Sequence, residues 1–147
     1  MIIPSPSTYR PSLSDFKQAA ERIKGIALRT PLIPLRTYDE DPGIVLKPEM
    51  LQPIGSYKIR GVYNWVKKLS PEQREKGIST ASSGNMAQAV AYTAKLFNIP
   101  ARTIVFDTTP QTKIDSIQKY GGEVVRKTFD EWVEYTVNPD MDRSFLH

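Results

Sequence analysis

Short runs of β-favouring residues alternate with helical patterns in the second half of the chain. The runs cover residues 78–81, 101–106 and 123–127, and each is rich in Ile, Val, Thr or Phe. Between them, residues 86–97 and 110–120 carry apolar side chains at helical spacing. Strand, helix and strand at this spacing are typical of right-handed crossovers in a parallel sheet. The pattern therefore predicts an α/β fold with three layers around a parallel sheet.

The first part of the chain predicts fewer regular elements. Ser12 and Asp15 form a possible capping box before a helical pattern that stops at Gly25. The segment 28–35 contains two prolines, which lack an amide donor, so a strand there must lie at an edge or be broken. Residues 43–46 are better suited to a strand.

Helix-starting signals also occur in the later part of the chain. The segment 70–73 has a capping Ser followed by Pro, and Thr128 is followed three residues later by Glu131. The second signal predicts a last helix over residues 129–137. Residues 138–147 carry no strand pattern, and we expect them to form a loop without a closing strand.

The amino-acid composition excludes several catalytic classes. The chain has 147 residues, no Cys, and one His, which is His147. Disulfides, thiolate zinc sites, cysteine nucleophiles and Ser-His-Asp triads are therefore excluded, and we expect no metal site. Acid–base chemistry would have to come from Lys, Asp, Glu, Tyr or Ser, or from a cofactor.

Charge and hydropathy exclude two further kinds of partner. The formal net charge is +4, but the adjacent basic pairs are confined to Lys67-Lys68 and Arg126-Lys127. Basic runs that would follow a phosphate backbone are absent, so we expect no nucleic-acid partner. No stretch approaches the length of a membrane span and the chain begins without a signal pattern. The sequence therefore predicts a soluble, cytoplasmic protein without a membrane partner.

A turn-rich segment, residues 52–61, leads into a predicted helix. Its apolar side chains recur at helical spacing and form one face, made of Ile59, Val62, Tyr63, Val66 and Leu69. Ser56 is the natural N-cap, which places Lys58 in the first helical turn. The positive end of the helix dipole disfavours an ammonium ion there, and imine formation needs the neutral amine. Lys58 therefore suits Schiff-base chemistry, although an ordinary surface lysine is the alternative.

A second segment, Ser82-Ser83-Gly84-Asn85, lies between a predicted strand and a predicted helix. In an open parallel sheet, ligands bind at the carboxyl ends of the strands, where the free amides of helix N-termini attract anions. A carboxylate or phosphate could dock there. The alternative is a simple capping loop, because Ser, Gly and Asn are common in such turns.

The two segments together are much more specific than either alone. Gly55-Ser56-Tyr57-Lys58-Ile59-Arg60-Gly61, followed by Ser82-Ser83-Gly84-Asn85-Met86-Ala87-Gln88, resembles motifs of pyridoxal-phosphate enzymes of the tryptophan-synthase-β fold type. The likeness is strongest to the threonine/serine dehydratases and extends from about Leu13 to Asp130. It includes the stretches 29–32, 47–49, 110–113 and 120–124.

The resemblance implies specific roles for matching residues. Lys58 matches the lysine that binds pyridoxal phosphate covalently and moves protons at the substrate Cα. Asn85 matches the residue that hydrogen-bonds the cofactor's ring oxygen. The loop that holds the substrate carboxylate matches Ser82, Ser83, Gly84, Asn85 and Gln88. In the similar serine racemases the second Ser of this loop, here Ser83, is an acid/base group on the opposite face.

The same resemblance implies a reaction and a place in metabolism. The expected reaction is loss of water from threonine or serine to give an oxo acid and ammonia, as in isoleucine biosynthesis. Serine racemase, cysteine synthase and threonine synthase are alternatives within the family. Met86 stands where the family usually has His, which weakens any role for that position.

The resemblance covers the amino-terminal portion of these enzymes. Residues 1–55 match an amino-terminal piece of the large domain and residues 56–147 match the small α/β domain, whereas the carboxyl-terminal half of the large domain is absent. The Gly-rich loop that cradles the cofactor phosphate is part of what is absent. We therefore expect a truncated chain that forms homo-oligomers. The alternatives are a non-catalytic remnant and one half of a two-chain enzyme whose partner supplies the rest.

Overall fold

The parallel sheet has three strands and lies at the centre of the structure. The computed structural model describes residues 10–35, 43–138 and 145–146. Strands β3 (Ile78–Ala81), β4 (Ala101–Phe106) and β5 (Glu123–Lys127) pair in the order β3-β4-β5, and both pairings are parallel. The strand bounds are those predicted from the sequence, and the prediction of a parallel sheet is confirmed.

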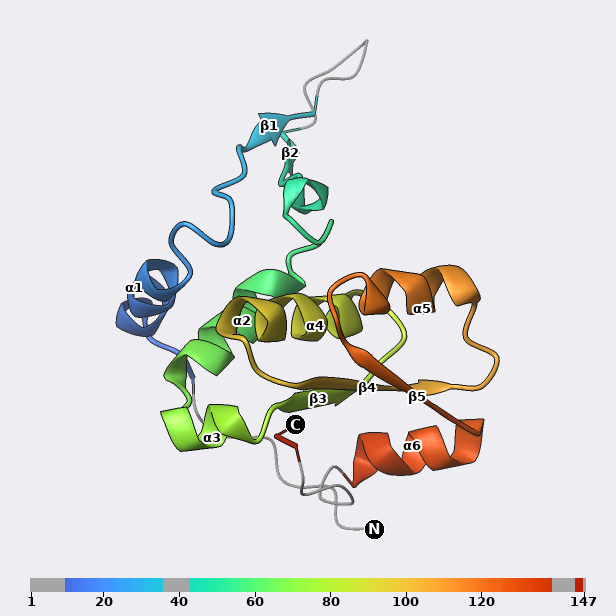
Figure 1. The fold of residues 1–147 in the computed structure, drawn as a ribbon. Coiled ribbons are helices and arrows are strands. Elements are labelled where there is room, and N and C mark those ends of the chain that lie inside the picture. The colour runs from blue at the N-terminus through green and yellow to red at the C-terminus, as the bar shows by residue number, and fades with distance from the viewer. Residues whose placement is uncertain (1–9, 36–42, 139–144, 147) are drawn as a thin grey trace.

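Helices cover both faces of this sheet, as Figure 1 shows. Helices α4 (Asn85–Phe97) and α5 (Gln111–Gln118) lie on one face, and α6 (Phe129–Val137) lies on the other. Helix α2 (Lys58–Lys68) packs on α4, and the short α3 (Pro71–Glu75) leads into β3. Helices lie on both faces of the sheet, and the central strand β4 is mostly buried while the edge strand β5 is not, which confirms the three-layer α/β prediction.

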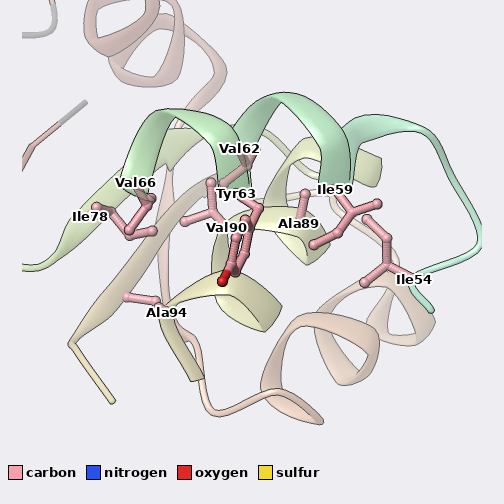
Figure 2. Close-up of a cluster of buried hydrophobic side chains, with 10 residues drawn as sticks. Ile54, Ile59, Val62, Tyr63, Val66, Ile78, Ala89, Val90 and Ala94 are labelled. Atoms are coloured by element: carbon pink, nitrogen blue, oxygen red, sulfur yellow. The ribbon is translucent and has the colours of Figure 1, made fainter. Parts of the chain in front are cut away.

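The main hydrophobic core lies between α2, α4 and β3. Ile59, Val66 and Ile78 are completely buried there, and Val90 is nearly so. Figure 2 shows the side chains of α2 pointing toward those of α4. The stripe predicted on α2 is confirmed, although its last member, Leu69, is only partly buried. This packing holds α2 in a defined position on the domain.

The predicted helix starts are present as capping boxes. The Ser12 hydroxyl accepts from the Asp15 amide before α1 (Leu13–Arg22), and Ser70 and Thr128 make the same bond before α3 and α6. Each such cap satisfies amide donors that have no partner inside the helix. Helix α4 ends at Asn98, which adopts the left-handed conformation with φ 53°. The local signals therefore place these helix ends correctly.

The chain before α2 has short elements. Strands β1 (Ile33–Pro34) and β2 (Val45–Leu46) form an antiparallel pair of two residues each, followed by the 3-10 helix η1 (Glu49–Leu51). The strand expected over residues 43–46 is thus shorter than predicted. All four strand residues are exposed. A ribbon this small is not independently stable in water, so contacts elsewhere must hold this part of the chain.

Residues 139–144 and 147 of the segment 138–147, which we expect to form a loop without a closing strand, lie outside the described residues. Leu146 forms a parallel bridge with Ile78 at the outer edge of β3. The Leu146 amide donates to the Gly77 carbonyl at 3.1 Å, and the Ser79 amide donates to the Leu146 carbonyl at 2.7 Å. This contact is an isolated bridge and not a strand. The sequence did not predict it, because backbone pairing to a distant edge leaves no local sequence pattern.

Within the described ranges, no helix is both long and apolar enough to cross a membrane. The same ranges contain no group of three His, Cys, Asp or Glu side chains suited to a metal ion.

Candidate functional site

Lys58 is the first residue of α2, as the sequence predicts. Gly55 turns the preceding loop with φ +71°, and Tyr57 immediately precedes the helix. The predicted N-cap is displaced by one residue: Tyr57 occupies that position and makes no side-chain capping bond. Ser56 still contributes, because its hydroxyl accepts from the Lys58 amide at 3.4 Å. The Lys58 ammonium lies 5.0 Å from the centre of the Tyr57 ring.

Lys58 lines a cavity of about 520 Å³ between α2, β3 and α4. Val62, Trp65, Met86 and Val90 give it an apolar wall. Helices α2 and α4 run in the same direction, as the labelled side chains in Figure 2 show. Their N-terminal turns therefore lie at the same end of the domain, and Lys58 and Met86 reach one cavity from them.

The loop 82–84 connects β3 to α4 at the carboxyl end of the sheet. The Ser82 hydroxyl accepts from the Gly84 amide at 3.3 Å, and Gly84 is the N-cap of α4. No side chain caps this helix. The first amides of α4 therefore have no partner inside the helix and are suited to an anion. Asn85 is the first helical residue and is exposed.

The predicted site residues are only partly brought together. Lys58 lines the cavity, whereas Ser82, Ser83, Gly84, Asn85 and Gln88 do not belong to its wall. Met86, for which the sequence predicts no firm role, does belong to it. In the part of the chain that the structure describes, no hydrogen bond joins the Lys58 side chain to the loop 82–85. The loop and the lysine are neighbours through Met86 rather than in contact.

Sequence reasoning missed a polar cluster beside Lys58. Arg60 donates two bonds to Glu49, from Nε to Oε2 at 2.9 Å and from its terminal nitrogen to Oε1 at 2.8 Å. Thr30 Oγ1 donates to Glu49 Oε1 at 2.7 Å, and Gln52 Nε2 donates to Oε2 at 3.2 Å. The Arg60 guanidinium is the largest cause of a Glu49 pKa lowered from 4.5 to about 2. Glu49 in turn raises the pKa of Arg60.

The sequence alone does not predict that these side chains come together. Glu49, Gln52 and Thr30 lie in segments without hydrophobic periodicity, and Arg60 alone is indistinguishable from a surface arginine. The structure nevertheless buries Thr30 and Gln52 almost completely. Polar groups so buried require partners, which the four side chains provide for one another.

Comparison of the sequence with known proteins finds a matching family and similar relatives. The family described as "Pyridoxal-phosphate dependent enzyme" matches residues 23–142. An L-threo-3-hydroxyaspartate ammonia-lyase of Saccharomyces cerevisiae is 39% identical over 118 residues, which are 79% of this chain and 36% of that protein. A catabolic L-threonine dehydratase of Staphylococcus aureus is 42% identical over 119 residues, which are 79% of this chain and 34% of that protein.

A solved structure also matches the fold. The maize serine racemase superposes with a TM-score of 0.79 at 32% identity, covering 95% of this chain and 44% of that one. The chain thus spans about a third of the length of the curated relatives that it matches, from 34% to 36% for the two named above.

Proposed function

Because the chain belongs to the family of pyridoxal-phosphate-dependent enzymes, we propose that Lys58 binds this cofactor and that the protein removes water from a hydroxy amino acid. One observation carries the proposal. Lys58 and Met86, from the first turns of α2 and α4, line the same cavity. An amine and an uncapped helix N-terminus therefore lie at one end of the domain, and they suit the aldehyde and the anionic groups of pyridoxal phosphate and its substrate.

The chain's own residues then have distinct roles. When bound, pyridoxal phosphate withdraws electrons from the substrate Cα. The Lys58 amine would take the Cα proton and, as an ammonium, return a proton to the β-hydroxyl, which would leave as water. Hydrolysis of the released enamine would then give an oxo acid and ammonia. Asn85, at the start of α4, would hold the ring oxygen of the cofactor by a hydrogen bond. Backbone amides of the loop 82–84 and the start of α4, with the Gln88 side chain, bind the substrate carboxylate.

The relatives support this class of reaction and leave the substrate open. They are named as acting on hydroxyaspartate and threonine, and one solved relative is a serine racemase. The cavity wall beside Lys58 is apolar, and Arg60, the other cation among the described residues that line it, is bonded to Glu49 and to the Leu28 carbonyl. A substrate with a methyl or hydrogen, such as threonine or serine, suits this wall better than one with a second carboxylate.

Racemisation of serine is the second candidate. Ser83 occupies the loop position at which the similar racemases have an acid/base hydroxyl, and it is partly buried rather than fully exposed. A hydroxyl on the face opposite Lys58 would return a proton to the substrate Cα from the other side. Chiral analysis of recovered serine separates this activity from oxo-acid release. Cysteine synthase and threonine synthase activities are separated by their different substrates.

The cofactor assignment is tested by covalent trapping. The 147-residue chain is incubated with pyridoxal phosphate and treated with borohydride, and its peptides are mapped by mass spectrometry. We expect the added mass on Lys58, and its loss in Lys58→Arg. Lys67→Arg, which changes a lysine at the far end of α2, should leave the trapping unchanged. Trapping spread evenly over surface lysines would contradict the assignment and favour a non-catalytic remnant.

A two-chain enzyme is tested separately. If a second polypeptide supplies the rest of the site, mixing this chain with it should produce oxo acid from threonine at a rate that depends on both concentrations. The Lys58→Arg variant should abolish that rate.

A further inference from the structure

We propose that Glu49 is a positioning residue for Lys58. By holding Arg60, it fixes the first turn of α2 and with it the place of the Lys58 amine. This inference rests on the proposed function, because it concerns the lysine that is assigned there to the cofactor.

The bond between Glu49 and Arg60 defines an orientation as well as a distance. Two parallel bonds, at 2.9 and 2.8 Å, join the guanidinium to the two carboxylate oxygens. A third bond runs from Arg60 to the Leu28 carbonyl at 2.7 Å. Bidentate pairing of this kind restricts rotation of the guanidinium, which a single ion pair does not. Arg60 is therefore held on two sides.

Glu49 is itself held by the surrounding chain. Its side chain is 17% exposed and accepts from Thr30 and Gln52 as well as from Arg60. Gln52 also pairs with Leu28 in both directions, donating to its carbonyl and accepting from its amide at 2.9 Å. The Glu49 carboxylate therefore links residues 28–30 and 49–52 to Arg60 and so fixes the position of α2 relative to them.

The first turn of α2 needs such support. Tyr57 makes no side-chain cap, and the Ser56 hydroxyl accepts from the Lys58 amide only at 3.4 Å, so this helix end is weakly capped and frays readily. Ile59 is completely buried and fixes the turn against the core. Arg60, the next residue, fixes it to Glu49. Lys58 precedes both, and its ammonium lies 5.0 Å from the centre of the Tyr57 ring.

A pair of opposite variants separates positioning from charge. Glu49→Gln removes a negative charge near Lys58 and leaves Arg60 and Lys47, whose Nζ lies 3.9 Å from Glu49 Oε1, without it. Arg60→Gln removes a positive charge instead and leaves Glu49 with Lys47. Both variants break the bidentate contact. If the contact positions Lys58, both should change its reactivity in the same direction. If Glu49 and Arg60 act only through their electric field, the two changes should be opposite.

Competitive acetylation provides a readout that needs no cofactor. The 147-residue chain is labelled with trace acetic anhydride, and labelling of Lys58 is measured relative to Lys67 and Lys68 in the same folded molecule. We expect the Lys58 ratio to change at least about threefold, in the same direction, in both variants. Amide exchange in the first turn of α2 should speed up about tenfold, while the last turn is unaffected. Borohydride trapping of pyridoxal phosphate on Lys58 should fall about tenfold.

The matched control is Glu123→Gln. It breaks the ion pair with Arg102, whose N–O distance is also 2.9 Å, on the far strands of the sheet. It should change none of the three readouts. Where Glu49→Gln does not fold, Thr30→Val removes one bond to Glu49 and should shift acetylation and exchange in the same direction by a smaller factor.

The outcomes separate this inference from the function it rests on. Unchanged Lys58 acetylation in folded Glu49→Gln and Arg60→Gln, or opposite changes in the two, would overturn the positioning role even if both proteins melt earlier. Restoration of the wild-type ratio in Glu49→Asp would support it. Failure of the wild type to trap the cofactor would refute the proposed function, and acetylation would still decide the role of Glu49.

Discussion

Glu49 gives a single-residue test of how polar contacts contribute to stability. Its pKa is about 2 in the folded chain, against an ordinary 4.5. A carboxylate whose folded pKa is lowered adds stability above its unfolded pKa and loses it as the pH falls through the folded value. We expect unfolding free energy to fall between pH 4.5 and pH 2, by at most about 3 kcal/mol from this group.

The measurement is the urea midpoint of the chain across that pH range. The decrease should be smaller in Glu49→Gln, because the neutral side chain has no proton to gain. Glu123→Gln, at an ion pair where the carboxylate is half exposed, should retain the wild-type slope. Equal slopes in wild type and Glu49→Gln would contradict the prediction.

Gly122 gives a second test at the scale of one residue. A Cβ there would lie 2.9 Å from the Ala91 Cβ and 3.0 Å from Ile117 Cγ2, both in the helices that cover the sheet. We expect Gly122→Ala to cost about 2 kcal/mol, because β5 would have to move away from α4 and α5. Chemical denaturation measures the change in unfolding free energy. A loss of stability smaller than that of a typical surface substitution would show that α4 and α5 can shift to accommodate the methyl group.

The sequence predicted single residues well where their roles were local. Thr128 and Ser12 cap helices because each signal spans four neighbouring residues. The cluster around Glu49 could not be predicted, because it joins Thr30, Glu49 and Arg60 from three separate segments. Among the site residues, the sequence correctly predicted Lys58 in the first turn of its helix. It could not predict that the loop 82–85 lies outside the cavity wall, because this depends on how α2 packs on α4.

At the scale of elements, the bounds of the parallel strands were predicted from the sequence, whereas the pairing of β1 with β2 was not, and the strand expected over residues 43–46 is longer than β2. Strands β3, β4 and β5 are short runs with β-favouring residues, and helix caps and glycines lie near their ends, so the ends have chemical markers. The two-residue strands β1 and β2 contain a proline and exposed side chains, and no periodicity defines a pair so short. The bridge of Leu146 to β3 was missed for a related reason, since it is a backbone contact between distant segments.

Helix α2 permits a test of an element's own stability. Gly61 lies within it, and a Cβ at that position would meet nothing within 4 Å. Ala has a higher helix propensity than Gly, so Gly61→Ala should stabilise the chain by about 0.5–1 kcal/mol. Thermal unfolding measures the gain. A loss of stability would indicate that the cavity beside Gly61 is occupied or strained in solution.

At the scale of the whole molecule, an apolar surface on the first part of the chain lacks a partner within the described residues. Ile33, Val45, Leu46 and Leu51 are between 45% and 55% exposed. Exposed apolar groups gathered in this way tend to associate. We expect the chain to self-associate, with a mass in light scattering that rises with concentration. Val45→Lys should reduce this, whereas Leu96→Lys on α4 should not, and a monomer at high concentration would contradict it.

The catalytic rate is the second prediction at this scale. The 147-residue chain spans about a third of the curated relatives it matches, so we expect it to release oxo acid from threonine negligibly even with added pyridoxal phosphate. Alignment of substrate and catalytic groups can account for roughly 7–11 kcal/mol of a barrier, and most of the aligning chain in the relatives lies outside the matched part. Rapid turnover that Lys58→Arg abolishes would show that oligomers complete the site.

The contact of Leu146 with β3 has a consequence for synthesis on the ribosome. The edge strand β3 and the two other strands of the sheet, β4 and β5, are translated before Leu146 emerges, so the edge of β3 at which the Ile78–Leu146 bridge forms stays open while the sheet assembles. An open strand edge is a template for pairing with another nascent chain. Slow translation of residues 128–144 would prolong this interval, and chaperone binding should concentrate on ribosome-bound chains that end before Leu146.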